Sequence, residues 1–267
     1  TTDSTKYDLI IGANDTTIQA PMDSIRLFSD YTNCTSISNL SMLDTANVTY
    51  MNNMFDSCNK LISLDVSNFN TTKATNMMDM FFGCNNLSSL KLDNFNTSNV
   101  TTMYRMFYDC RALKSLDLVN FDTSNVTDMM SMFSGCSNLT SLDISNFNTT
   151  SVTDMEYMFN SCSFLKSLDL SNFDTINVMD MRRMFYGCYN LTNLDVSNFN
   201  TSNVTSMNRM FAYCNNLTNL DVSKFDTSKV TDMGNIFEAC QDLTNLDVSN
   251  FNTSNVTSMN RMFAYCN

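Results

Sequence analysis

The sequence is most informative at first for what it lacks: it has no histidine and no tryptophan, and one proline and five glycines in 267 residues. Without histidine, the residue most often used for acid–base catalysis is missing. No glycine-rich phosphate-binding loop and no Ser-His or Cys-His arrangement is present either. We therefore expect that the protein is not an enzyme and that it carries no cofactor, with calcium as the one candidate considered below.

Positive charge and long apolar runs are also scarce. Fifteen Lys and Arg stand against 27 Asp and Glu, which gives a net charge of −12. Nucleic-acid binders need basic residues that contact phosphates, so we expect no nucleic-acid partner. No apolar stretch approaches the length of a transmembrane helix, and we expect no membrane-spanning segment in this chain.

Cysteine, by contrast, is regularly spaced along most of the chain. From Cys58 onward the spacing is 26 residues at every step, at Cys58, Cys84, Cys110, Cys136, Cys162, Cys188, Cys214, Cys240 and Cys266. The apolar positions keep the same period, as in Leu139, Leu142, Ile144, Phe147, Val152, Met155, Met158, Phe159 and Cys162. One such repeat cannot bury its own apolar side, so neighbouring copies must stack into a solenoid.

Spacing within a repeat indicates its local structure. Leu194 and Val196 alternate with polar residues, which is typical of a short strand with one buried face. Further along, the spacing is mostly three and four residues, which favours a short helical segment, at Val204, Met207, Met210, Phe211 and Cys214. The sequence therefore predicts an α/β fold: a leucine-rich-repeat solenoid with one curved parallel sheet and short helical segments on the opposite face.

The repeats also suggest a domain organisation. Residues 1–33 contain the single proline, Pro21, and lie before the first cysteine, so we assign them to an N-terminal cap. Residues 34–267 form a solenoid of about nine 26-residue coils. Residues 191–215 and 243–267 are identical, which indicates a recent duplication, and we expect that a C-terminal cap is absent. We assign the abundant methionines to the core. The cysteines form no Cys-x-x-Cys pair, and we assign them to the core as buried free thiols.

One outward strand position is acidic in nearly every coil. The column consists of Asp65, Asp117, Asp143, Asp169, Asp195, Asp221 and Asp247, and Lys91 replaces it once. Neighbouring carboxylates about 5 Å apart repel each other, so something must offset the charge. Hydrogen bonds to nearby Ser, Thr or Asn, a basic partner surface and calcium are three alternatives. A column of asparagines, interrupted by Lys224, and a column of threonines run beside the aspartate column. We interpret both as structural.

Residues that depart from the period are a second kind of candidate. Tyrosine and arginine recur irregularly in and after the expected helical segments, and both are favoured at interface hot spots, although many cover core edges instead. The candidate ligand-binding residues are Asp117, Asp143, Asp169, Asp195, Asp221, Lys91, Lys224, Tyr104, Tyr157, Arg183 and Arg209.

Two repeat units carry a family resemblance, LDLVNFDTSNVTDMMSMFSGC at 116–136 and LDLSNFDTINVMDMRRMFYGC at 168–188. This string resembles the BspA-like leucine-rich repeats of bacterial surface proteins, over residues 22–267. The resemblance implies an extracellular or cell-surface location and an adhesin, or ligand-binding module, that recognises a host or matrix protein or a glycan. A structural stalk or spacer that presents another domain is the alternative. The resemblance carries over no catalytic residues.

Overall fold

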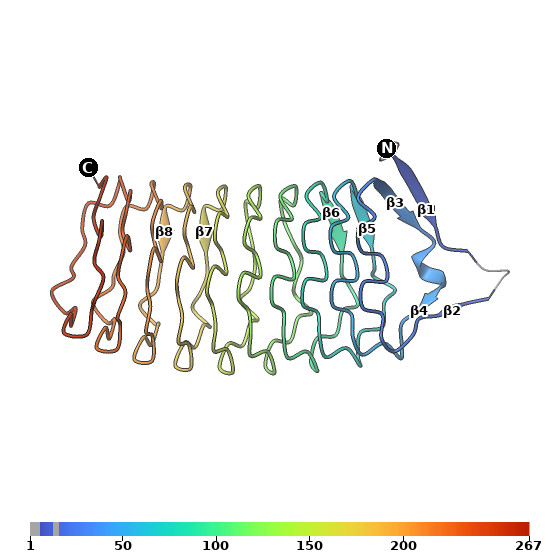
Figure 1. The fold of residues 1–267 in the computed structure, drawn as a ribbon, viewed down its shortest axis with the longest axis horizontal. Coiled ribbons are helices and arrows are strands. Elements are labelled where there is room, and N and C mark those ends of the chain that lie inside the picture. The colour runs from blue at the N-terminus through green and yellow to red at the C-terminus, as the bar shows by residue number, and fades with distance from the viewer. Residues whose placement is uncertain (1–5, 13–15, 267) are drawn as a thin grey trace.

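The computed structural model describes residues 6–12 and 16–266. The chain winds into similar coils that stand side by side in a row, with the N-terminal elements at one end and the C-terminal coil at the other (Figure 1). The elements are β1 (Tyr7–Ile10), β2 (Ile18–Gln19), β3 (Cys34–Ser38), the 3₁₀ helix η1 (Leu40–Met42), β4 (Leu43–Asp44), β5 (Ser63–Asp65), β6 (Ser89–Lys91), β7 (Ser167–Leu168) and β8 (Asn193–Leu194).

The parallel pairing that we expected is present, but one continuous sheet is not found among the described residues, which corrects that prediction. Strands pair as β1 with β3, β2 with β4, β5 with β6 and β7 with β8. The strands β5 and β6 have three residues each and β7 and β8 two each, and the coils between β6 and β7 form no strand, so the pairing breaks into two-stranded pieces. A longer column of single parallel bridges runs from Asp23 through Tyr50 to Ser258. The column begins at Asp23, inside residues 1–33, which we assigned to the cap.

The expected α or 3₁₀ segments before each cysteine do not form: the described residues contain no α-helix, and their one 3₁₀ helix, η1, lies outside these segments. Where we expected one, successive turns alternate two kinds of hydrogen bond. The Asn53 N–H donates to the Met78 carbonyl of the next coil at 2.8 Å, whereas the Met54 N–H donates to Met51 at 3.3 Å. Asn53 has a left-handed φ of 58°, as the third residue of a type II turn requires. Alternate N–H groups thus bond to the next coil, so no i−4 ladder can form.

We call this segment, from eight residues before each cysteine to the cysteine, the turn run, and the segment that carries β5 to β8 the strand run. Successive four-residue turns place apolar side chains every three or four positions, as a helix does. The spacing therefore predicted the buried residues correctly, but it predicted a helical backbone where the chain forms successive turns.

The core is built from columns of identical side chains. Phenylalanines of the turn run stack nearly parallel with ring centroids 5.6 to 5.9 Å apart, from Phe55 to Phe237. Most methionines of the turn run, such as Met129, Met132, Met155 and Met158, are fully buried beside them, which confirms their assignment to the core, whereas Met78 and Met130 are half-buried. Each cysteine from Cys58 to Cys266 donates its S–H to a phenylalanine carbonyl of the preceding coil at 3.1 to 3.2 Å.

This cysteine column leads to a prediction about thiol reactivity. All ten cysteines are free and all except Cys266 are buried, which confirms the interpretation as free thiols. Burial raises the pKa of the Cys136 and Cys188 thiols to about 12, and only the thiolate reacts quickly. With a chromogenic disulfide reagent at pH 8, we expect one fast thiol in the folded protein and the rest only after unfolding in urea. Several fast thiols before unfolding would contradict the buried column.

Polar columns link the coils to each other. The buried Thr149 Oγ1–H donates to the Asp174 carbonyl at 2.8 Å, and Thr149 Oγ1 accepts from the Asp174 N–H at 2.8 Å. The Asn198 side-chain amide donates to the Leu170 and Phe173 carbonyls of the preceding coil at 2.9 Å. The threonine and asparagine columns are therefore structural, as expected, because they satisfy backbone groups at bends.

Candidate binding surface

The aspartate column lies on the strand run, where its side chains are exposed and hydrogen-bonded locally. Asp143 Oδ1 accepts from the Ser145 N–H at 3.1 Å and from the Ser145 hydroxyl at 2.7 Å. Bonds to the N–H two residues on recur at Asp65, Asp117, Asp169, Asp195, Asp221 and Asp247. The Ser145 bonds lower the pKa of Asp143. Of the three alternatives for offsetting the charge of the aspartate column, the structure thus contains the local hydrogen bonds.

The two lysines among the candidates act on this acidic column. Lys91 Nζ lies 3.1 Å from Asp65 Oδ2, an exposed ion pair between neighbouring coils. The charge of Lys224 contributes to lowering the pKa of Asp195 and Asp221, after the larger effect of their serine hydrogen bonds. In the part of the chain that the structure describes, no group of three or more His, Cys, Asp or Glu is placed to hold a metal ion.

The candidate tyrosines and arginines lie elsewhere, on the turn run. Around Tyr104, the Arg105 Cζ lies 4.5 Å from the Tyr104 ring centroid and 4.9 Å from the Phe82 ring. The same guanidinium pairs with the largely buried Asp79, with Nε 2.9 Å from Oδ1. This aromatic–arginine cluster is therefore neutralised from within the chain.

A second cluster, two to four coils further on, is not neutralised. Arg183 Cζ lies 5.2 Å from the Tyr157 ring centroid and 5.4 Å from that of Tyr186, and the Tyr186 and Tyr213 rings are 5.3 Å apart. Arg209 occupies the position of Arg183 one coil on. Within residues 6–12 and 16–266, neither arginine forms an ion pair. We call Tyr157, Arg183, Tyr186, Arg209 and Tyr213 the arginine–tyrosine surface.

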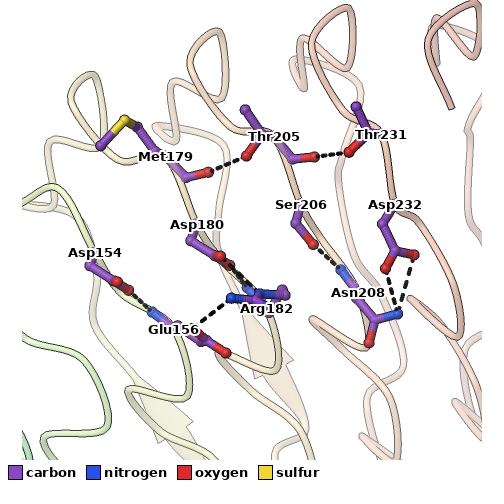
Figure 2. Close-up of polar contacts among 10 residues, drawn as sticks. All are labelled: Asp154, Glu156, Met179, Asp180, Arg182, Thr205, Ser206, Asn208, Thr231 and Asp232. Carbon is purple, nitrogen blue, oxygen red and sulfur yellow. Dashed lines mark hydrogen bonds and ion pairs between the residues drawn. The ribbon is translucent and has the colours of Figure 1, made fainter. Parts of the chain in front are cut away.

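Arg182, which precedes Arg183 in the chain, forms ion pairs with two carboxylates, as Figure 2 shows. Arg182 Nη2 lies 2.9 Å from Glu156 Oε2, and Arg182 Nε lies 2.8 Å from Asp180 Oδ2. Asp154 Oδ1 accepts from the Glu156 N–H at 2.8 Å. Burial raises the pKa of Glu156 and Asp180. This acidic network, which our sequence reasoning did not identify, neutralises Arg182 and leaves Arg183 as a free cation.

The same coil carries exposed apolar side chains that the sequence analysis did not identify. Phe164, Ile176 and Met179 are 53%, 36% and 54% exposed, and Tyr189, one of the irregularly placed tyrosines, is 44% exposed. Ile176 and Met179 stand where the next coil has Ser202 and Thr205. Met179 belongs to a shallow hollow lined by Thr153, Asn177, Met179, Asn203, Thr205 and Lys229. A bulky apolar residue at a position that is otherwise Ser or Thr was the signal available in the sequence.

Three aspartates in successive coils of the bridge column give a prediction about pH. Burial is the largest cause that raises the pKa of Asp128, Asp154 and Asp180. A carboxyl group whose pKa is higher in the folded than in the unfolded chain favours folding below its unfolded pKa, and loses that contribution as pH rises through its folded pKa. At neutral pH these charged groups therefore disfavour folding.

Asp128→Asn is expected to raise the free energy of unfolding at pH 7 by about 0.5–1 kcal/mol, because the amide removes a partly buried charge. Asn76 occupies this column and accepts from the Met78 N–H at 2.9 Å, so an amide fits the site. Urea unfolding at pH 7 and pH 4 measures the effect, which should shrink at pH 4. Asp143→Asn is the control and should give no gain at pH 7, and a gain for Asp128→Asn that is equal at both pH values would contradict the account.

Comparison with known proteins supports the fold. The family model described as "Mycoplasma protein of unknown function, DUF285" matches residues 22–117, 112–218 and 189–267. No curated protein matches the chain. In the described part of the chain, no helix has the length and apolar character needed to cross a bilayer.

Two solved bacterial structures are similar. A leucine-rich repeat protein from Bacteroides ovatus has 18% identity and a TM-score of 0.55, over 97% of this chain and 58% of that one. This chain thus spans a little over half of that protein's length. A leucine rich cell surface protein from Faecalibacterium prausnitzii has 15% identity and a TM-score of 0.37, over 96% of this chain and 88% of that one. The first likeness shows a leucine-rich-repeat fold.

Proposed function

Because this chain belongs to the DUF285 family and has a leucine-rich-repeat fold, we propose that it is a non-catalytic binding module of a bacterial cell surface. In this proposal it acts as an adhesin that recognises a host or matrix protein or a glycan. The resemblance of its repeat string to the BspA-like repeats supports the surface location and the adhesive role. Fold alone does not determine function, so the proposal depends on the surface of this particular chain.

One observation carries the proposal: two neighbouring coils combine several exposed departures from the repeat, while others, such as Ile62 and Val119, lie singly in other coils. Exposed Ile176 and Met179, the neutralised Arg182 and the free Arg183 belong to one coil, and Arg209 to the next. Tyrosine and arginine are favoured at interface hot spots, and exposed apolar side chains are typical of the core of an interface. The stacking of the coils does not require these residues. Other coils have Ser202 and Thr205 at the positions of Ile176 and Met179, and the position of Arg183 is Asn53, Ser131 and Asn235 elsewhere, as well as Arg105 and Arg261.

A stalk or spacer is the second candidate. The identity of residues 191–215 with 243–267 favours it, because duplication of a coil lengthens a rod without creating a unique site. In that case the clustered departures would have no effect on binding, and the ligand would be bound by another part of a longer protein.

Replacing the departures by the residues of other coils separates the two candidates. The variant combines Tyr157→Asn, Ile176→Ser, Met179→Thr, Arg183→Asn and Arg209→Asn, and each new residue already occupies the same position elsewhere in the chain. We expect the native chain to bind immobilised mucin or extracellular matrix saturably, and this consensus variant to lose that binding while it keeps its circular dichroism spectrum. No saturable binding by the native chain, or equal binding by both, would favour the stalk.

We propose further that this binding needs no cofactor. The carboxylates of the aspartate column already accept backbone and serine hydrogen bonds, so calcium is not required to hold them. The same binding assay with calcium and with a chelator should give equal affinities. Binding that disappears with the chelator would instead assign calcium to the column.

A further inference from the structure

We propose that the arginine–tyrosine surface is a carboxylate-binding site that takes a short acidic segment of a protein partner. This inference rests on the proposed binding function and assigns it a place and a ligand chemistry. The site consists of the two guanidinium groups of Arg183 and Arg209, bordered by the rings of Tyr157, Tyr186 and Tyr213.

The backbone holds the two arginines at one coil spacing. The Arg183 N–H donates to the Asn208 carbonyl at 2.9 Å, directly before Arg209. Both residues have left-handed backbone, with φ of 53° and 57°. Adjacent strands of such a ladder are about 4.8 Å apart, so two cations project from the same position of neighbouring coils. The Tyr157 and Tyr186 rings restrict Arg183, which reduces the ordering that a ligand must impose.

The charges around this pair indicate an anionic ligand. Arg26, Arg105, Arg111 and Arg182 are each paired with an aspartate or glutamate of the chain. Arg183, Arg209 and Arg261 form no such pair within the described residues, and of these three only Arg183 and Arg209 lie in neighbouring coils. Two neighbouring unpaired cations repel each other, and a bound carboxylate would relieve both.

The chemistry of the surface favours a carboxylate of a peptide. The planar guanidinium donates two parallel N–H groups that match the two oxygens of a carboxylate. Ile176 and Met179 are exposed in the same coil as Arg183, so a peptide that runs along this coil from Arg183 would also meet apolar side chains. A long polyanion would meet the net charge of −12 on the rest of the chain, whereas a short acidic segment flanked by apolar residues would not.

The chain contains its own control for this site. The coil of Arg261 is identical to that of Arg209 over 25 residues. The coil before Arg209 carries Arg183 and Tyr186, whereas the corresponding residues before Arg261 are Asn235 and Glu238. The site therefore arises from one neighbouring pair of coils and not from the repeated sequence itself.

The test measures the fluorescence anisotropy of a labelled ten-residue peptide that alternates glutamate and valine, with a glutamine–valine peptide as the uncharged probe. We expect saturable binding of the acidic peptide only, weakened at least about tenfold, or 1.4 kcal/mol, by Arg183→Asn with Arg209→Asn. The matched control Arg261→Asn should change the affinity less than about twofold. Asn53 and Asn235 already occupy this position with left-handed backbone, so the variants are expected to fold.

Three results would overturn the inference. Equal weakening by Arg261→Asn would mean that binding follows total charge and not this site. No binding of the acidic peptide, while the native chain still binds mucin or matrix, would reject the carboxylate site and leave the proposed function standing. A uronic-acid oligosaccharide that binds more tightly than the peptide, with the same sensitivity to the double variant, would replace the peptide by an acidic glycan.

Discussion

Phe159→Ala is expected to lower the free energy of unfolding by about 3–5 kcal/mol, the cost of a large cavity in a packed core. The Phe159 side chain is fully buried, and its ring stacks on Phe133 and Phe185 at centroid distances of 5.7 Å on both sides. Removing the ring therefore breaks two aromatic contacts and leaves a void between three coils. Urea unfolding followed by far-ultraviolet circular dichroism measures the loss.

Phe164→Ala is the matched control, because Phe164 lies five residues further on and its side chain is 53% exposed. We expect this change to alter stability by less than about 0.5 kcal/mol, as is usual at surface positions. Losses of similar size for the two variants would contradict the stacked phenylalanine column as the centre of the core.

Thr149→Val is expected to lower the free energy of unfolding by about 1–3 kcal/mol, the cost of buried backbone groups left without partners. Valine has nearly the shape of threonine, but it cannot bond to the Asp174 N–H and carbonyl, which Thr149 Oγ1 now satisfies at 2.8 Å each. The loss of stability would therefore come from hydrogen bonds and not from packing. The same urea titration measures it.

Thr153→Val tests whether burial decides the effect. The Thr153 Oγ1–H donates to the Thr127 carbonyl at 3.3 Å, but the side chain is exposed, so water can replace the bond. We expect little change in stability. A cost for Thr153→Val as large as that for Thr149→Val would show that the buried threonine column has no special structural role.

The sequence was sufficient for the repeat, the core and the polar columns, because each depends on side-chain chemistry that recurs every 26 residues. Phe159, Cys162 and Thr149 are buried where the period places them. The backbone of the turn run was not predictable in the same way. Met51, Met54 and Phe55 have the spacing of a helix. Only the acceptors of the backbone N–H hydrogen bonds distinguish a helix from stacked turns.

The candidate site was predictable in part. Tyr157, Arg183 and Arg209 were identified as departures, and the structure brings them onto one surface, whereas the aspartates lie on the strand run. The distinction between Arg182 and Arg183 depends on which carboxylates lie in adjacent coils. Pairing across coils is set by the register of the solenoid, so the sequence alone did not reveal which arginine is free.

The central claim is that ligand binding depends on the departures from the repeat and not on its regular columns. The most direct test compares mucin or matrix binding by the consensus variant with binding by a column variant that carries Asn at Asp117, Asp143, Asp169, Asp195 and Asp221. An asparagine oxygen can still accept the bond from the N–H two residues on, as at Asn148 and Thr150, so the column variant should fold. We predict that the column variant binds within about twofold of the native chain and that the consensus variant loses at least about tenfold, or 1.4 kcal/mol. Loss of binding in the column variant, with binding retained in the consensus variant, would contradict the claim.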